Sequence, residues 1–140
     1  MQEFNSKSPE ETEEVGGELL RRYGKDKIFC LSGPLAAGKT TLVKGLAREI
    51  GIEKTIVSPS YVLLREYEGD YQLFHLDLFR IQTGNEFIEA GLDDYLLDPG
   101  GTVAIEWADR IEDILPGNRV DVELELAGDD NRIIRARLVT

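Results

Sequence analysis

The sequence predicts an α/β protein, a three-layer sandwich in which helices cover both faces of a mixed central β-sheet. An apolar run of strand length, residues 27–32, precedes a glycine-rich turn and a helical pattern of apolar residues. Few helical segments separate the later strands, whereas a purely parallel sheet needs a crossover helix between its strands. The C-terminal segment alternates apolar and charged residues on both sides of a turn, which is typical of a β-hairpin.

Length, composition and charge limit the kind of protein. With 140 residues, 41% of them hydrophobic, the chain is predicted to form one domain, residues 1–140, around one core. The formal net charge of −11 disfavours strong direct attraction to a nucleic-acid backbone. An apolar run of about 18 residues is absent, as is an apolar leader, and Cys30 is the single cysteine. These features predict a cytoplasmic protein that has no membrane partner.

The first predicted element is a helix from Pro9 to about Tyr23. Ser8 suits the N-cap, proline suits the first helical position, and Glu11 closes a capping box with Ser8. The apolar residues share one face, and Gly24 suits the end of the helix. We therefore expect this helix to pack on a face of the sheet.

The next elements surround the glycine-rich turn. Residues 27–32 predict a buried strand before it, and residues 41–50 predict a helix after it, which Gly51 ends. Residues 55–57 predict a short strand that stops at Ser58-Pro59-Ser60.

The remaining elements are mostly strands. Tyr61–Glu68 and Tyr71–Phe79 predict a hairpin that turns at residues 69–70. Residues 85–97 predict a helix that Gly91 weakens or ends. We then expect a buried strand, a short helix and a second hairpin, at residues 102–107, 110–115, 120–126 and 133–139, with a turn at 128–131.

The glycine-rich turn, Gly33–Thr40, reads Gly-Pro-Leu-Ala-Ala-Gly-Lys-Thr and matches the P-loop pattern G-x-x-x-x-G-K-[ST] in full. In such a loop, backbone N–H groups and the positive end of the following helix converge on one anion site. Lys39 adds a charge toward the β- and γ-phosphates, and Thr40 offers a hydroxyl to Mg²⁺. We therefore predict a P-loop NTPase-like fold that binds a purine nucleoside triphosphate and hydrolyses it. Positive electrostatic potential is needed only at the loop, so a chain with a negative net charge can still bind an anionic nucleotide there.

Two carboxylates end apolar strands. Asp77 follows residues 73–76, and Glu106 follows residues 103–105. A P-loop enzyme needs an acid near the metal and a group that orients the attacking water. We assign Glu106 to Mg²⁺ and Asp77 to orienting water or to supporting the metal ligands. The alternative for each is a charge that meets solvent where a strand ends.

Four other side chains keep two interpretations each. His75 is the only histidine; a structural role is favoured over a zinc site, because it has no Cys or His partners. Trp107 either belongs to the core or leans over the site. Arg80 and Arg110 are candidates for stabilising phosphate charge, and plain surface exposure is the default for both.

Four motifs together resemble the bacterial TsaE (YjeE) family, over about residues 11–139: the P-loop with Thr41, Ser58-Pro59-Ser60-Tyr61, His75–Arg80 and Ile105-Glu106-Trp107. The family supplies an ATPase to tRNA threonylcarbamoyladenosine biosynthesis at adenosine-37. The resemblance implies ATP and Mg²⁺ as cofactors, and weak hydrolysis by the isolated chain. It also implies two partner proteins, TsaD and TsaB, with tRNA contacted only indirectly through the complex.

The resemblance also implies roles for single residues. Thr40 and Glu106 would bind Mg²⁺, and Lys39, Asp77, Glu106 and Trp107 would act in hydrolysis. Ser58–Tyr61 would be a switch segment near the γ-phosphate, and the segment around Thr12 would lie near the adenine. The residues implied to bind the nucleotide are Thr12, Leu35, Ala36, Ala37, Gly38, Lys39, Thr40, Thr41 and Arg110.

Three positions depart from the family pattern, and two other functions stay open. Ala36, Ser60 and Phe79 stand where the family usually has Gly, Thr and Tyr. Ala36 could restrict the loop backbone, and Phe79 lacks a hydroxyl. The alternatives are a small-molecule P-loop kinase and a nucleotide-gated, GTPase-like binding module. The sequence contains no arginine cluster suited to a kinase lid and no Asn-Lys-x-Asp tetrapeptide, which guanine-binding proteins typically carry.

Overall fold

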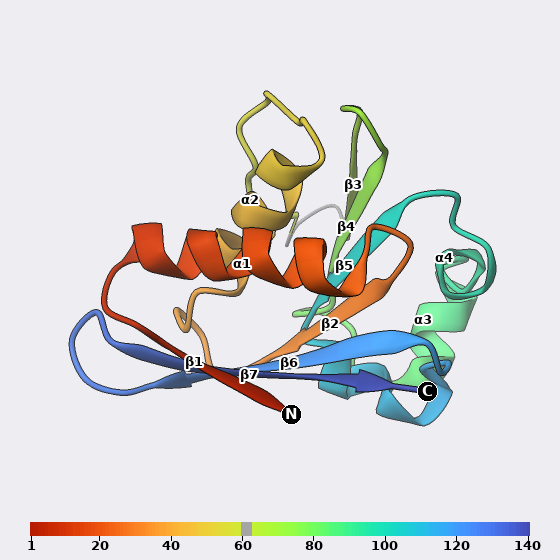
Figure 1. Cartoon of the computed structure of the whole chain (residues 1–140). Coiled ribbons are helices and arrows are strands. Elements are labelled where there is room, and N and C mark those ends of the chain that lie inside the picture. The colour runs from red at the N-terminus through yellow and green to blue at the C-terminus, as the bar shows by residue number, and fades with distance from the viewer. Residues whose placement is uncertain (60–62) are drawn as a thin grey trace.

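The computed structural model describes residues 1–59 and 63–140, which form a seven-stranded sheet with helices on both faces (Figure 1). The strands are β1 (Gln2–Ser6), β2 (Ile28–Ser32), β3 (Leu64–Tyr67), β4 (Leu73–Asp77), β5 (Thr102–Glu106), β6 (Arg119–Leu126) and β7 (Arg132–Val139). The helices are α1 (Pro9–Tyr23), α2 (Lys39–Glu49), α3 (Gly84–Glu89), α4 (Asp94–Leu97) and the 3₁₀ helix η1 (Ala108–Ile114).

The sheet is mixed, as predicted. Its strand order is β1-β7-β6-β2-β5-β4-β3. The central strands β6, β2, β5 and β4 are parallel, and β3, β7 and β1 add antiparallel edges. Parallel strands end at the same edge of a sheet, so the segments that follow β2, β4 and β5 meet there.

Helices α1 and α2 cover one face of the sheet and pack closely on each other (Figure 1). A Cβ atom on Gly45 would lie 1.8 Å from the Glu13 carbonyl oxygen, and one on Gly16 would lie 2.2 Å from that of Leu42. Glycine at these positions therefore lets the two backbones touch. The largest fully buried side chains of this layer include Leu19, Phe29, Leu31, Leu42 and Leu46.

The second face is covered over β4 and β5 by α3, α4 and η1, whose apolar side chains form a separate cluster with Ile105 and Leu76. Over β6 and β7 the same face carries charged side chains instead. The three-layer prediction is confirmed. None of the helices described is long and apolar enough to cross a membrane.

Helix α1 begins and ends as predicted. The Ser8 hydroxyl accepts a hydrogen bond from the Glu11 N–H at 3.1 Å. The Glu11 carboxylate accepts the N–H of Lys7 at 2.8 Å, one residue earlier than the capping box requires. Gly24 ends the helix with a φ of 96°.

One predicted element is absent, one predicted helix is divided, and one strand was not predicted. Residues 55–57 are not a strand: the N–H of Val57 bonds to the Tyr67 hydroxyl at 3.4 Å rather than to a neighbouring strand. The helix predicted at residues 85–97 ends near Gly91, as one of the two predicted outcomes had it: Gly91 adopts a φ of 78°, and the segment is divided into α3 and α4. Strand β1 was not predicted, since one of its five residues, Phe4, is apolar, although its half-buried and exposed side chains alternate.

The other elements lie close to their predicted bounds. β6 and β7 form the predicted C-terminal hairpin. β3 and β4 pair antiparallel, as the first predicted hairpin requires, although residues 60–62 lie outside the described part of the chain. The short helix begins at Ala108, two residues earlier than expected, and it is a 3₁₀ helix. β5 ends at Glu106, so Trp107 follows the strand instead of closing it.

Candidate functional site

The loop between β2 and α2 has the backbone of an anion nest. Gly33, Ala36 and Gly38 have φ values of 145°, 65° and 100°. A Cβ atom on Gly33 would lie 2.4 Å from the Leu124 carbonyl oxygen, so glycine is required there. Ala36 adopts the left-handed conformation despite its Cβ, at a cost of about 1–2 kcal/mol. The departure from glycine at this position therefore does not prevent the loop from forming.

Lys39, the first residue of α2, folds back over the loop. Its Nζ atom donates hydrogen bonds to the carbonyl oxygens of Gly33 at 2.5 Å and Pro34 at 2.9 Å. The same atom lies 4.0 Å from the centre of the Trp107 ring. Burial lowers the pKa of the ammonium, and the negative charge of Glu106 opposes that shift. The loop thus concentrates one desolvated positive charge at the N-terminus of a helix.

Strand register brings the two predicted carboxylates together at the sheet edge next to this loop. Glu106 pairs with Leu31 on β2 and with Asp77 on β4. Asp77 is fixed by two donors: the Ser58 hydroxyl reaches Oδ2 at 2.9 Å, and the N–H of Phe79 reaches Oδ1 at 2.9 Å. Both carboxylates are buried, so the alternative of a charge meeting solvent at a strand end does not hold.

Glu106 also connects the loop to the interior of the sheet. Its Oε2 atom accepts a hydrogen bond from the Thr40 hydroxyl at 2.7 Å. The Nε2 atom of His75 lies 2.6 Å from the same oxygen. The sequence placed Thr40 and Glu106 in one site but left His75 outside it, because the diagonal contact between β4 and β5 is invisible before the strand register is known.

Trp107 leans over the site, and its partly buried side chain also packs against the apolar cluster under α3, α4 and η1. It has a φ of 63°, which turns its ring toward Lys39 at the point where β5 ends. The Arg110 guanidinium also lies near this ring, 5.0 Å from its centre. Arg110 donates to the carbonyl oxygens of Phe79 at 2.8 Å and Ile81 at 3.0 Å, so its half-buried guanidinium is anchored to the segment that follows β4. Arg110 is not among the described residues that line the cavity beside the loop.

A cavity of about 490 Å³ gathers most of the predicted site residues. This size is in the range of small-ligand sites. Among the residues predicted to bind the nucleotide, Ala37 is a buried member of the loop, and its N–H donates to the Pro34 carbonyl oxygen at 3.2 Å. The cavity is lined by Leu35, Ala36, Gly38, Lys39, Thr40, Thr41, Ser58, Asp77, Phe79, Arg80, Glu106 and Trp107.

Thr12 lies on the other side of the loop, against Gly38. Its hydroxyl shares a 2.8 Å hydrogen bond with that of Ser6. It lines a cavity of about 200 Å³ together with Thr41 and Arg132. Arg132 donates to the Ala36 carbonyl oxygen at 3.2 Å. Sequence reasoning missed this arginine, because nothing in the β6–β7 hairpin indicates that it reaches the loop.

The donor set suits Mg²⁺ better than a transition metal. Among the residues described, no group of three or more His, Cys, Asp and Glu side chains is arranged to hold a metal. Mg²⁺ in nucleotide sites is held by one or two protein oxygens together with substrate phosphates and waters. The adjoining oxygens of Thr40 and Glu106 fit that requirement, and they lie beside the loop.

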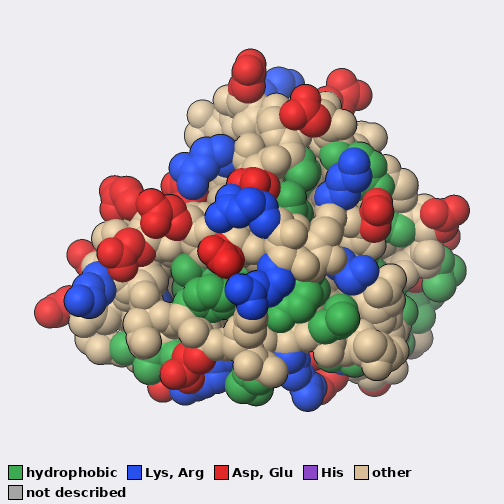
Figure 2. All heavy atoms as spheres, in the orientation of Figure 1, with side chains coloured by type: hydrophobic (Ala, Val, Ile, Leu, Met, Phe, Trp, Pro, Cys, Tyr) green, Lys and Arg blue, Asp and Glu red, His purple; other side chains and the backbone are tan. Residues whose placement is uncertain are grey.

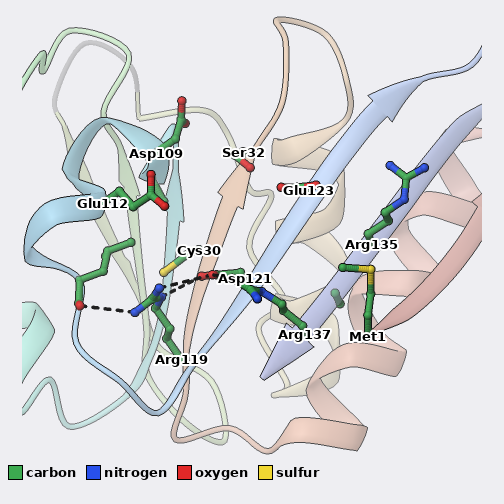
Figure 3. A pocket seen from close by; sticks show the side chains of 13 residues that line it. Met1, Cys30, Ser32, Asp109, Glu112, Arg119, Asp121, Glu123, Arg135 and Arg137 are labelled. Carbon is green, nitrogen blue, oxygen red and sulfur yellow. Dashed lines mark hydrogen bonds and ion pairs between the residues drawn. The ribbon is translucent and has the colours of Figure 1, made fainter. Parts of the chain in front are cut away.

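A separate cavity of about 220 Å³ lies over β6 and is bordered by charged side chains (Figure 3). Arg119 forms an ion pair with Asp121 there, at 2.8 Å. Burial raises the pKa of the Cys30 thiol to about 12. A thiol needs to ionise before it attacks as a nucleophile, so Cys30 is structural, as its apolar sequence context predicts.

The chain is similar to a known protein family over most of its length. A family profile described as threonylcarbamoyl adenosine biosynthesis protein TsaE matches residues 6–134. A relative from Treponema pallidum, named tRNA threonylcarbamoyladenosine biosynthesis protein TsaE, is 36% identical over 129 residues, which cover 92% of this chain and 95% of the relative. A Bacillus subtilis relative of the same name is 37% identical over 129 residues, covering 91% of this chain and 79% of the relative.

A solved structure agrees with these relatives. The crystal structure of Bacillus subtilis YdiB superposes with a TM-score of 0.80 at 33% sequence identity, and the match covers 99% of this chain and 86% of that one. Its fold is thus the fold described above, and the family profile spans the P-loop and both strand-end carboxylates. The chain belongs to the TsaE family.

Proposed function

We propose that this chain binds ATP together with Mg²⁺ at the P-loop and hydrolyses it, as a component of tRNA threonylcarbamoyladenosine biosynthesis. One observation carries the proposal: the loop lysine, the Thr40 hydroxyl and the Glu106 carboxylate all face one cavity beside the N-terminus of α2. The names of the relatives support the biosynthetic role.

The phosphates would be held by the loop N–H groups, the N-terminus of α2 and Lys39. Lys39 now bonds to two loop carbonyl oxygens, and it would exchange these partners for phosphate oxygens. Thr40 and Glu106 would hold Mg²⁺, which when bound neutralises charge on the β- and γ-phosphates. The local charge thereby compensates for a chain whose net charge is −11.

Asp77 is the proposed group for orienting the attacking water, directly or by supporting the metal ligands. Two hydrogen bonds, one to each oxygen, fix its carboxylate beside Glu106. A fixed acceptor can align a nucleophile without reorganising during the reaction. Trp107 is proposed to act in hydrolysis by keeping Lys39 oriented through its ring, with the Arg110 guanidinium also in contact with the indole.

The adenine is proposed to lie on the Thr12 side of the loop. The cavity beside Thr12 shares three lining residues with the cavity at the P-loop: Ala36, Gly38 and Thr41. A base in that position would leave the phosphates over the loop. The predicted switch segment begins at Ser58, which bonds to Asp77; its residues 60 and 61 lie outside the described residues.

Partner proteins are proposed to complete the machinery, with TsaD and TsaB as the candidates and tRNA contacted through their complex. Acidic and basic side chains are interspersed on the face of the molecule seen in Figure 2. Such a surface differs from the basic stripe typical of proteins that grip a phosphate backbone directly. We expect hydrolysis to be slow in the isolated chain and faster when both partners are added.

A product assay tests this function. The purified chain is incubated with Mg²⁺ and either ATP or GTP, with and without the two partner proteins, and free phosphate is measured. We expect free phosphate from ATP, a higher rate with partners, and none above background from Lys39→Ala. A phosphorylated metabolite in place of free phosphate would support the small-molecule kinase, and a preference for GTP would support the GTPase-like module.

A further inference from the structure

His75 lies directly behind the proposed metal ligands and is fully buried, with 0% of its surface exposed. It belongs to the central part of β4, where its neighbours Phe74 and Leu76 are buried apolar residues. Its register partner on β5 is Ala104, and Glu106 is two residues further along that strand. The imidazole therefore reaches Glu106 diagonally across two adjacent parallel strands.

The chemistry of the contact fixes the direction of its hydrogen bond. A carboxylate can only accept, so Nε2 of His75 carries the proton that it shares with Oε2 of Glu106 at 2.6 Å. Nδ1 is buried and has no hydrogen-bond partner among the described residues. An unsatisfied buried polar atom costs about 1–3 kcal/mol. Because an apolar side chain would avoid this cost, the benefit of a histidine here comes from its one hydrogen bond to Glu106.

That hydrogen bond acts on a carboxylate which a second donor also fixes. The Thr40 hydroxyl donates to the same Oε2 atom at 2.7 Å. Two donors on one oxygen, one from β4 and one from α2, determine the rotation of the carboxylate about its side-chain bonds. The other oxygen, Oε1, accepts no hydrogen bond from the residues that the structure describes, and it belongs to a residue that lines the cavity.

We propose that His75 is a positioning residue that orients Glu106 for binding a divalent cation. The proposal rests on the proposed function, in which Thr40 and Glu106 bind Mg²⁺ beside the nucleotide phosphates. His75 does not touch the cation or the nucleotide; it keeps Glu106 in the one rotation that lets the carboxylate and the Thr40 hydroxyl act together. Partners of this kind, which hold a metal ligand in place, typically change metal affinity about 10- to 100-fold.

Calorimetric titration with ADP, in Mg²⁺ and separately in EDTA, tests the proposal without measuring hydrolysis. The ratio of the two affinities is the gain due to Mg²⁺. In His75→Leu, which lacks a donor, we expect this gain to fall about 10-fold while the affinity in EDTA stays unchanged. In His75→Gln, whose amide N–H reaches the position of Nε2, we expect the gain to be retained.

A second pair of variants guards against loss of folding in His75→Leu. His75→Gln and His75→Asn bury the same amide group, but the shorter Asn side chain cannot reach Glu106. We expect Asn to lose the Mg²⁺ gain and Gln to keep it, at equal melting temperatures. In a Glu106→Ala background, His75→Leu should cause no further loss of the Mg²⁺ gain, because both changes remove the same interaction.

Several results would overturn the positioning role. One is a His75→Leu variant with the full Mg²⁺ gain, and another is an equal loss of ADP affinity in Mg²⁺ and in EDTA. A third is a Gln variant as defective as Asn. Failure of the proposed function looks different: the wild-type chain itself would bind no ADP, or would bind it equally well with and without Mg²⁺, which would overturn both proposals.

Discussion

Charged side chains meet in two regions of this molecule, and their burial differs sharply. At the carboxyl edge of the central strands, Lys39 and Glu106 are 5% and 3% exposed. On the charged face over β6 and β7, Arg135 contacts Glu125 at 2.7 Å and Glu3 at 3.0 Å, but the three side chains are 31%, 53% and 53% exposed. Figure 3 shows Arg135 standing away from the sheet on that face.

Similar distances therefore have different consequences. An exposed ion pair contributes about 0–1 kcal/mol, because water solvates the separated charges nearly as well. A buried charge is costly in free energy until it is fully paired. A ligand that pairs with the buried charges therefore changes the free energy of the cluster strongly. The comparison predicts that changes at the strand ends alter binding, whereas changes on the charged face alter stability slightly and binding not at all.

The largest expected effect is that of Lys39→Ala on nucleotide affinity. Loss of two charge-assisted contacts to phosphate, worth about 1.5 kcal/mol each, would weaken ATP binding on the order of 100-fold. The melting temperature should not fall, because the change also removes a desolvated ammonium. Calorimetry and thermal unfolding measure the two effects. Lys44→Ala, on the same helix, is the matched control; an equal loss there would mean that general charge and not the loop lysine binds the phosphates.

The second effect is that of Glu106→Ala on the Mg²⁺ dependence of binding. Removing a proposed Mg²⁺ ligand should lower the affinity gain due to Mg²⁺ at least as much as losing the His75 hydrogen bond does, which is about 10-fold. Asp77→Ala should leave that gain intact and slow the release of phosphate. Titrations of ADP in Mg²⁺ and EDTA distinguish the two carboxylates. If the Asp77 variant instead loses the gain, the assignments are reversed.

The third effect is a pH dependence set by Lys39. Burial lowers its pKa below the ordinary value of 10.5. In the proposed function the protonated ammonium binds phosphate, so ADP affinity in EDTA should fall as pH rises through the lowered pKa, by at most about tenfold per pH unit. The contribution of Lys39 to folding has the opposite sign: stability rises over the interval between the lowered pKa and 10.5. Lys39→Ala should abolish both trends, and an unchanged pH profile in that variant would assign them to another group.

The smallest effect belongs to the charged face. Arg135→Ala should lower the free energy of unfolding in urea only slightly, because water solvates the separated charges, with ATP affinity and phosphate release unchanged. High salt should reduce the difference between this variant and the wild type, because exposed charges are screened. A large loss of stability, or a loss of ATP affinity, would contradict the distinction between the two regions.

The sequence predicted the parts of the site that depend on local pattern. Gly33–Thr40 is one contiguous motif, and Asp77 and Glu106 each end an apolar run, so parallel strands suffice to bring them to one edge. The mixed sheet and the C-terminal hairpin followed from alternation and turn residues. These features need no knowledge of how distant strands align.

The contacts that the sequence could not predict depend on how distant strands align and on which distant segments they meet. The contact between His75 and Glu106 requires β4 and β5 to be aligned so that His75 opposes Ala104. The contact of Arg132 with the loop requires the position of a distant hairpin. β1 has too few apolar residues to identify a strand, and it forms because β7 offers an open edge.

The ring of Trp107 is in contact with the ammonium of Lys39, and the chain contains a single tryptophan. All tryptophan fluorescence of the chain therefore comes from a residue beside the P-loop. A bound phosphate would draw the Lys39 ammonium away from the Trp107 ring and so change that fluorescence. The fluorescence of Trp107 is therefore an intrinsic probe of nucleotide binding. Stopped-flow fluorescence of the unlabelled protein should record nucleotide arrival and departure in real time, even inside a larger assembly whose other subunits lack tryptophan.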